Sequence, residues 1–201
     1  MWLDSPRIGT KMKKEVVLRR GAHASMALAP LYYALPVNLP FLGIHRWSVV
    51  VAFFGAIMVF EAFRLWKGIT FMGLRPHEKD QIASFAWAAA GITAVLWLCP
   101  HDIASAALIG MALVDPLAGE LRLAGVHDRV TLDSTLLVYF GLCIAVLLAW
   151  DMRSALESLL LSVVAAFLAV ASERIKTPYI DDDFLMSVVP AAAMTGLALL
   201  W

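Results

Sequence analysis

Two apolar blocks joined by a very short polar stretch decide the fold class. Residues 134–150 read STLLVYFGLCIAVLLAW and residues 154–171 read SALESLLLSVVAAFLAVA, with only Asp151, Met152 and Arg153 between them. Each block has the length that an α-helix needs to cross a hydrocarbon core of about 30 Å. Backbone groups in lipid must bond within their own segment, so we expect helices rather than strands. The pair therefore predicts two consecutive transmembrane helices.

Five further apolar blocks extend this pattern along the chain. Of the 201 residues, 61% are hydrophobic and the mean hydropathy is +0.78, whereas soluble domains have roughly 45–50% apolar residues. The further blocks cover residues 21–39, 47–65, 82–98, 103–121 and 184–201. Pro30 and Pro36 interrupt the first of these blocks. We expect an all-α polytopic membrane protein with about seven transmembrane helices.

The basic residues are divided very unevenly between the connections. Of the 16 Lys and Arg residues, only Arg46 and Arg153 fall on one side, and the other 14 fall on the side of the N-terminus. The positive-inside rule makes that side cytoplasmic and puts the C-terminus outside. We expect residues 1–20 to be a cytoplasmic basic tail and residues 21–201 to be a single transmembrane helical domain. Arg153 is four residues from Glu157, which predicts an ion pair at the outer interface.

Charge and cysteine usage narrow the class of protein further. The formal net charge is zero, which points to no nucleic-acid partner. Cys99 and Cys143 lie in or beside apolar blocks, which argues against a disulfide framework. We expect a multi-pass protein of a prokaryotic cytoplasmic membrane, with any chemistry on the cytoplasmic face.

An aspartate and a proline stand inside the fourth block, where residues 114–122 read VDPLAGELR. Pro116 removes a helical hydrogen bond and disfavours α geometry at Asp115. A broken helix at membrane depth is tolerated mainly where it faces protein or a watery cavity. A carboxylate beside freed carbonyls suits a hard cation such as Mg²⁺. We interpret Asp115 as functional, with a kinked helix and a capping aspartate as the alternative.

Three adjacent aspartates, Asp181, Asp182 and Asp183, directly precede the last block. One aspartate is enough to cap a helix and to interact with its dipole. Three like charges repel one another unless a cation or arginines neutralise them. The triplet therefore favours a divalent-metal site over capping alone.

Two acid and arginine pairs repeat a three-residue spacing. Glu61 and Arg64 share one helical face at the end of the second block, and Arg75 and Glu78 follow in the next loop. A charged pocket is one interpretation. An ion pair at the headgroup level with ordinary loop charges is the other.

Arg20 and His23 open the first block and suit a phosphate, although topogenic positive charge also explains the arginine. Phosphoryl transfer needs positioned Mg²⁺ and cationic groups on phosphate oxygens more than it needs a nucleophilic side chain. The acids and arginines share the expected cytoplasmic face. They therefore favour a site for Mg²⁺ and a nucleotide, which a lipid alcohol would enter from the side at the broken fourth helix.

The order of these features resembles the membrane polyprenol kinase family, the phytol and dolichol kinases, which use CTP or another nucleotide to phosphorylate an isoprenoid alcohol. The family's basic residue with a histidine resembles Arg20 with His23, and its acid and arginine pairs resemble Glu61, Arg64, Arg75 and Glu78. Its D-x-x-A segment with spaced glycines resembles Asp115, Ala118, Gly119 and Gly125. Its K-K-T-x-E-G-like stretch resembles Arg129, Thr131 and Asp133, and its final acidic motif resembles Glu173, Asp181–Asp183 and Pro190. Val130 and Asp183 depart from the family's lysine and asparagine, and the glycines are displaced. The chain thus resembles a divergent member.

The resemblance implies a role for each residue of the expected site. Glu173 or Asp183 would accept the hydroxyl proton, and Asp115 would act in catalysis and as a metal ligand. The Mg²⁺ ligands would be Asp115, Asp181, Asp182 and Glu61. The nucleotide, with CTP as the first candidate, would contact Arg20, His23, Arg64, Arg75, Glu78, Ala118, Gly119, Arg122, Arg129 and Thr131.

Two other functions are compatible with the same residues. A membrane cytidylyltransferase that makes a CDP-activated lipid shares part of the pattern. A non-catalytic transporter or scaffold would use the charges only for topology and helix packing. The expected partners are the lipid alcohol, the nucleotide and membrane lipids, and the oligomeric state stays open, a homodimer included.

Overall fold

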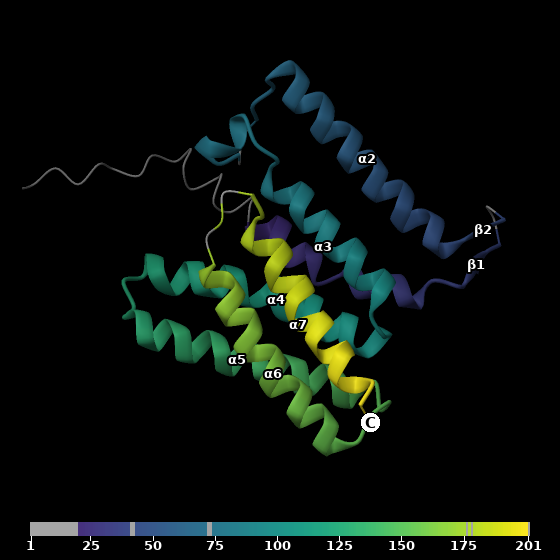
Figure 1. Ribbon diagram of the computed structural model, residues 1–201, viewed down its shortest axis with the longest axis vertical. Coiled ribbons are helices and arrows are strands. Elements are labelled where there is room, and N and C mark those ends of the chain that lie inside the picture. Colours follow the sequence, from purple (N-terminus) through teal and green to yellow (C-terminus); the bar gives the residue numbers. More distant parts are fainter. Residues whose placement is uncertain (1–19, 41–42, 72–73, 176, 178, 201) are drawn as a thin grey trace, which may run out of the picture.

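The structure is a computed structural model that describes residues 20–40, 43–71, 74–175, 177 and 179–200, and its regular elements are almost all helices (Figure 1). The long helices are α2 (Arg46–Lys67), α3 (Ser84–Leu98), α4 (His101–Leu123), α5 (Asp128–Ala149), α6 (Ala155–Arg174) and α7 (Asp182–Ala198). Residues 20–26 are also helical. Apart from Arg20, the expected basic tail lies outside the described residues.

Four helices, α2, α4, α5 and α6, are long and apolar enough to cross a membrane. The all-helical class expected for a membrane protein is therefore confirmed at this level. The helix α3 is apolar but has 15 residues, and α7 has 17 residues. The number of seven spans and the placement of the termini stay predictions.

The first expected span is not one helix across residues 21–39. Residues 20–26 are helical, a 3₁₀-helix η1 (Ala29–Ala34) follows, and β1 (Asn38–Leu39) then pairs antiparallel with β2 (Ile44–His45). Pro30 lies in the first turn of η1, where a backbone N–H has no acceptor within the helix, so the proline removes no hydrogen bond. The block is thus divided near its first proline, as the sequence predicted, but its second half is a 3₁₀-helix and a short hairpin.

The segment formed by residues 20–34 still runs from one end of the bundle to the other. His23 lies beside Asp115, near the C-terminal end of α4. The ring of Tyr33 stacks on that of His101, the first residue of α4, with 4.3 Å between ring centroids. At about 1.5 Å of rise per residue, this part of α4 covers roughly 20 Å.

The helix α4 runs without interruption through Asp115 and Pro116, so the expected break in the fourth span is wrong. The proline leaves the carbonyl of Ala112, four residues earlier, without its helical donor. Packing outweighs this loss, because α4 contacts η1 and the helices α3, α5, α6 and α7. Asp115 is therefore presented from a continuous helix, not from an unwound turn.

The core lies among the helices α3 to α7, and the most extensive contacts join α6 to α7, α4 to α5 and α5 to α6. Close approach depends on Gly110, where a Cβ would lie 2.8 Å from the ring of Tyr139. The helix α2 lies at the edge and packs mainly against α3 (Figure 1). The antiparallel order brings the ends of α2, α4 and α6 together with the starts of α3, α5 and α7.

The opposite end of the bundle is closed by a different set of polar contacts. The buried carboxylate of Asp102 bonds to Arg153, so Arg153 pairs with α4 rather than with Glu157 as expected. Glu157 instead accepts a hydrogen bond of 2.8 Å from the backbone N–H of Ser154 and caps α6. The charges at this end thus serve helix capping and packing.

Candidate functional site

A cavity of about 290 Å³ opens at the end of the bundle where α4 and α6 finish and α7 begins. Its lining residues are Arg20, His23, Arg75, Asp115, Pro116, Gly119, Arg122, Leu123, Glu173 and Asp182. All of these except Pro116 and Leu123 are residues that the sequence singled out for the site. The chain thus brings together charged groups from residues 20–26, the loop before α3, and the helices α4, α6 and α7.

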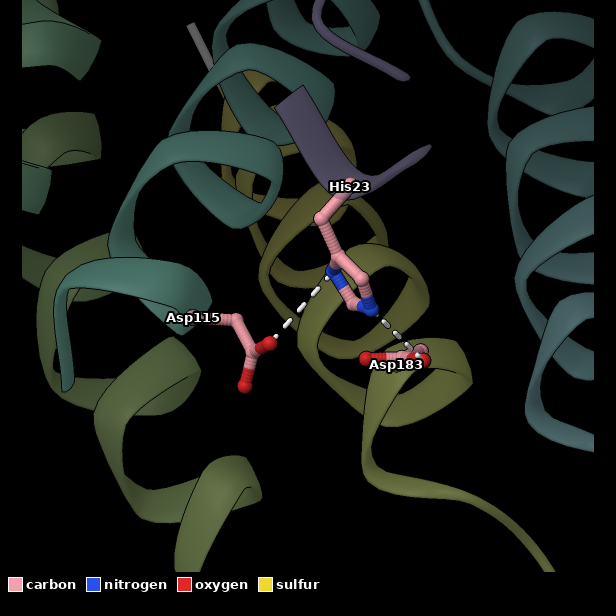
Figure 2. A group of neighbouring side chains, drawn as sticks. All are labelled: His23, Asp115 and Asp183. Atoms are coloured by element: carbon pink, nitrogen blue, oxygen red, sulfur yellow. Dashed lines mark ion pairs between the residues drawn. The ribbon is translucent and has the colours of Figure 1, made fainter. Parts of the chain in front are cut away.

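One imidazole lies between two carboxylates in this region (Figure 2). The Nδ1 atom of His23 is 3.4 Å from Oδ2 of Asp115, and its Nε2 atom is 3.6 Å from Oδ2 of Asp183. Asp183 is 1% exposed, and neither of its carboxylate oxygens accepts a hydrogen bond from a described residue. Burying such a carboxylate is costly unless a cation or donor is present. The three side chains offer ligand atoms within 4.8 Å of one another.

The three adjacent aspartates do not all have the same role at the start of α7. Asp181 is the N-cap of α7, and its carboxylate accepts a hydrogen bond of 3.2 Å from the backbone N–H of Asp183. Burial raises the pKa of Asp181 above its ordinary value because it disfavours the charged carboxylate, and the neighbouring Asp182 raises it further. The triplet also offers three carboxylate oxygens within 4.8 Å of one another. Capping therefore accounts for one of the three aspartates.

Arg75 neutralises part of this acidic start of α7. Its Nη1 atom is 3.1 Å from Oδ2 of Asp181 and 3.9 Å from Oδ1 of Asp182. Burial works against the charged guanidinium, but the neighbouring aspartates outweigh it, and the pKa of Arg75 lies above its ordinary value. Arg75 is thus a fixed positive charge at the wall of the cavity.

Glu78 holds the loop that carries Arg75. Its carboxylate accepts hydrogen bonds of 2.6 Å from the backbone N–H of Arg75 and 3.0 Å from that of Ser84. Burial works against ionisation, but these two N–H donors outweigh it, so the pKa of Glu78 lies below its ordinary value. The side chain does not line the cavity. Its position suits a positioning role rather than the nucleotide contact that the sequence predicted.

Glu61 and Arg64 form a buried ion pair that lies outside the lining of the cavity. The guanidinium makes two bonds of 2.7 Å to the carboxylate. It also donates to the carbonyl of Gln81 at 2.7 Å, and Glu61 accepts from the N–H of Ala83 at 2.7 Å. The pair joins α2 to the segment before α3. The structure therefore does not bring these two residues to the expected metal and phosphate site.

The remaining arginines of the cavity are each held by a carboxylate. Nη1 of Arg122 is 2.6 Å from Oε1 of Glu173, which is buried at the end of α6. Arg20 forms an ion pair with Glu120 of α4. Glu120 was not foreseen, because no regular spacing relates it to the other site residues. These pairs hold the N-terminal segment and α6 against α4.

Several expected nucleotide contacts lie elsewhere. Ala118 and Thr131 are buried in helix packing and Arg129 is exposed on α5, and none of the three lines the cavity. Gly125, with φ of 74°, ends α4 in a left-handed turn that only glycine adopts readily. Gly119 does line the cavity, and a Cβ there would meet no atom within 4 Å.

No family model matches the chain, and no curated protein or solved structure matches it. The chemistry of the cavity is therefore the basis for a function. The cavity combines three arginines and a histidine with three carboxylates. Such a set can bind phosphate groups on the arginines and a cation on the carboxylates.

Proposed function

We propose that the protein is a Mg²⁺-dependent membrane kinase that transfers a phosphoryl group from a nucleoside triphosphate, CTP being the first candidate, to an isoprenoid alcohol. The main support is the convergence of Arg20, Arg75 and Arg122 with buried and half-buried carboxylates in one cavity. Its volume of about 290 Å³ is near the lower end of ligand pockets, which suits the phosphates of a nucleotide better than the whole molecule.

The three arginines are the phosphate ligands of this proposal. They come from three separate segments and face one cavity, so they can contact different phosphate oxygens of one nucleotide. Each now contacts a carboxylate of the protein, among them Glu173 for Arg122. Binding would exchange these carboxylates for phosphate oxygens of the nucleotide. Arg64 and Arg129, which the sequence also placed among the nucleotide contacts, do not line the cavity and are left out of this set.

The carboxylates around His23 fit a divalent cation. Asp115 and Asp183 would hold it, because the buried oxygens of Asp183 lack hydrogen-bond donors among the described residues and hard cations prefer oxygen ligands. Asp182 adds a third carboxylate at the wall of the cavity. When bound, Mg²⁺ neutralises negative charge on the phosphate oxygens. Glu61, with its oxygens bound to Arg64 and Ala83, does not belong to this set.

The reaction forms a bond between the alcohol oxygen and the γ-phosphorus while the bond from that phosphorus to the bridging oxygen breaks. The nucleoside diphosphate leaves with the electron pair, and the hydroxyl proton passes to a carboxylate. Glu173 is bonded to Arg122, and Asp183 does not line the cavity. Asp182 lines it beside Arg75. We therefore assign the proton to Asp182 instead of the two residues that the sequence suggested.

The test uses purified protein with radiolabelled CTP or ATP, Mg²⁺, and phytol, geranylgeraniol or a short polyprenol. A phospholipid product that requires Mg²⁺ is the expected result. No such product from any combination contradicts the proposal. Release of pyrophosphate instead of a nucleoside diphosphate would assign the protein to the cytidylyltransferases.

The same proposal places the cavity on the cytoplasmic side, where nucleotides are found. It keeps seven membrane crossings, with residues 20–34 as the first and with α3 and α7 as short ones. The distribution of basic residues supports this orientation. The test replaces Cys99 and Cys143 by alanine, introduces a single cysteine at Asp128 or Asp151, and labels it with a membrane-impermeant reagent. In intact cells only the residue-151 variant should react, and the opposite result would reverse the topology.

A further inference from the structure

A second cavity lies beside the first and has a different character. Its volume is about 750 Å³. The lining residues that matter here are Asp80, Ile82, Trp87, Tyr179, Ile180 and Asp181. They come from the segment before α3, the first turn of α3 and the connection between α6 and α7. Neither Glu61 nor Arg64 is among them.

One ion pair separates the two cavities. Arg75 lines the first cavity and Asp181 lines the second. The Nη1 atom of Arg75 is 3.1 Å from Oδ2 of Asp181. Asp182, the next residue in the chain, lines the first cavity. A group that contacts Asp181 from the second cavity is therefore within a few ångströms of the charged wall of the first.

The two cavities differ in the charge of the molecules that they can accept. The first is lined by three arginines, whereas no lysine or arginine among the described residues lines the second. Its two charged lining residues are Asp80 and Asp181, the second of which is paired with Arg75. Carboxylates repel a phosphate but accept a hydrogen bond from a neutral hydroxyl. The rest of the wall includes Ile82, Trp87 and Ile180, which suit an apolar chain.

We propose that the second cavity binds the acceptor of the reaction, an uncharged long-chain alcohol, with its chain against Ile82, Trp87 and Ile180. Its hydroxyl binds Asp181 first and passes its proton to the neighbouring Asp182 when the alcohol oxygen reaches the first cavity. This inference rests on the proposed kinase function. The nucleotide and the alcohol then approach the Arg75–Asp181 pair from opposite sides. The neutral acceptor and the anionic donor are kept apart by the charges of the two cavities until they meet there.

The experiment uses the full-length protein in lipid nanodiscs with a photoreactive geranylgeraniol that carries a diazirine and an alkyne. Mass spectrometry should place most crosslinks within residues 80–87 and 179–181. Unlabelled geranylgeraniol should compete at least about tenfold better than its monophosphate, because Asp80 repels the phosphate and no described lysine or arginine lines this cavity to bind it. Crosslinks spread over the apolar surface, or equal competition by the monophosphate, would overturn the inference.

A pair of matched variants separates this inference from the kinase proposal. Ile180→Trp fills the second cavity, whereas Ile175→Trp makes the same change at a half-exposed residue outside its lining. Ile180→Trp should raise the KM for the alcohol by about tenfold and leave the nucleotide KM unchanged, while Ile175→Trp changes neither. An active enzyme whose alcohol KM is insensitive to Ile180→Trp refutes the acceptor site alone. Specific crosslinks without any phosphorylation refute the kinase proposal and leave alcohol binding in place.

Discussion

The Nδ1 atom of His23 lies 3.4 Å from Oδ2 of Asp115, although one residue belongs to the first helical segment and the other to the middle of the chain. The same ring reaches Asp183 of α7 through its Nε2 atom. His23 therefore connects its own segment to α4 and to α7 beside the cavity (Figure 2).

Asp115→Asn should abolish cation-dependent nucleotide binding while the protein stays folded. The change keeps the shape of the side chain but removes its charge. Activity and Mg²⁺-nucleotide affinity should fall by at least the ~10–100-fold that outer-shell residues of metal sites typically cost. Asp128→Asn is the matched control, because Asp128 is exposed on α5 and pairs with Arg174 outside the cavity. Titration calorimetry and thermal unfolding check both variants; loss of folding in Asp115→Asn alone would favour a packing role.

Arg75→Gln should weaken nucleotide binding by about 10–100-fold, since a charge-assisted hydrogen bond contributes about 1.5–3 kcal/mol. The loop itself should persist, because Glu78 bonds to the backbone of residue 75 and not to its side chain. Arg174→Gln removes an exposed arginine that lies outside the cavity and is the control. Equal nucleotide KM values for the two variants would remove Arg75 from the phosphate site.

Glu61→Gln should destabilise the protein and spare its chemistry. It leaves Arg64, which is fully buried, without its carboxylate partner. Breaking a buried pair typically costs about 3–5 kcal/mol. The unfolding temperature should drop, whereas the nucleotide KM at a temperature where the variant is folded should not change. A metal-ligand role for Glu61 predicts the reverse pattern, with a normal unfolding temperature and lost Mg²⁺ dependence.

The contribution of Glu78 to stability should depend on pH. Its pKa is lower in the folded protein than the ordinary value of 4.5, so the unfolded chain binds the proton more readily. The stabilisation is complete above the unfolded pKa and is lost as the pH falls through the folded pKa. The difference in unfolding free energy between the wild type and Glu78→Gln should therefore be largest at neutral pH and shrink below about pH 4. Denaturant titrations at several pH values measure it, and a difference independent of pH would contradict this assignment.

Gly110→Ala and Gly141→Ala should have opposite effects on stability. A Cβ at residue 110 would lie 2.8 Å from the ring of Tyr139, whereas at residue 141 it would meet no atom within 4 Å. Overpacking typically costs about 1–3 kcal/mol, and alanine in a helix is favoured over glycine by about 0.8–1 kcal/mol. Unfolding midpoints distinguish the two variants. Stabilisation by both would mean that α4 and α5 are farther apart than described.

The sequence predicted that several charged residues lie together, because charge and position along each block carry this information. Apolar blocks of membrane length imply alternating helices, so residues at alternate block ends must meet at one end of the bundle. This places Asp115, Arg122, Glu173 and Asp182 together without any knowledge of side-chain geometry. The four lie on the lining of one cavity in the structure.

The predictions that were wrong concern features that depend on packing between distant parts of the chain. The spacing of Glu61 and Arg64 shows that they share a helical face, but it does not reveal the backbone groups of residues 81 and 83 that bind them. The weak helix preference before Pro116 predicts a break, yet the neighbours of α4 keep the helix intact. Such outcomes depend on groups that are distant in the chain, which local pattern cannot identify.

Each arginine of the cavity contacts a carboxylate of the protein, so the proposed phosphate site would behave as an ion exchanger. Under the proposed function, phosphate oxygens would displace the side chains of Glu120, Asp181 and Glu173. The affinity would then reflect the difference between the binding of two anions and not the full strength of each new contact. A triphosphate would compete better than a diphosphate because it carries more charge. The internal carboxylates would then return to their arginines as the spent nucleotide leaves, which favours turnover over tight retention of product.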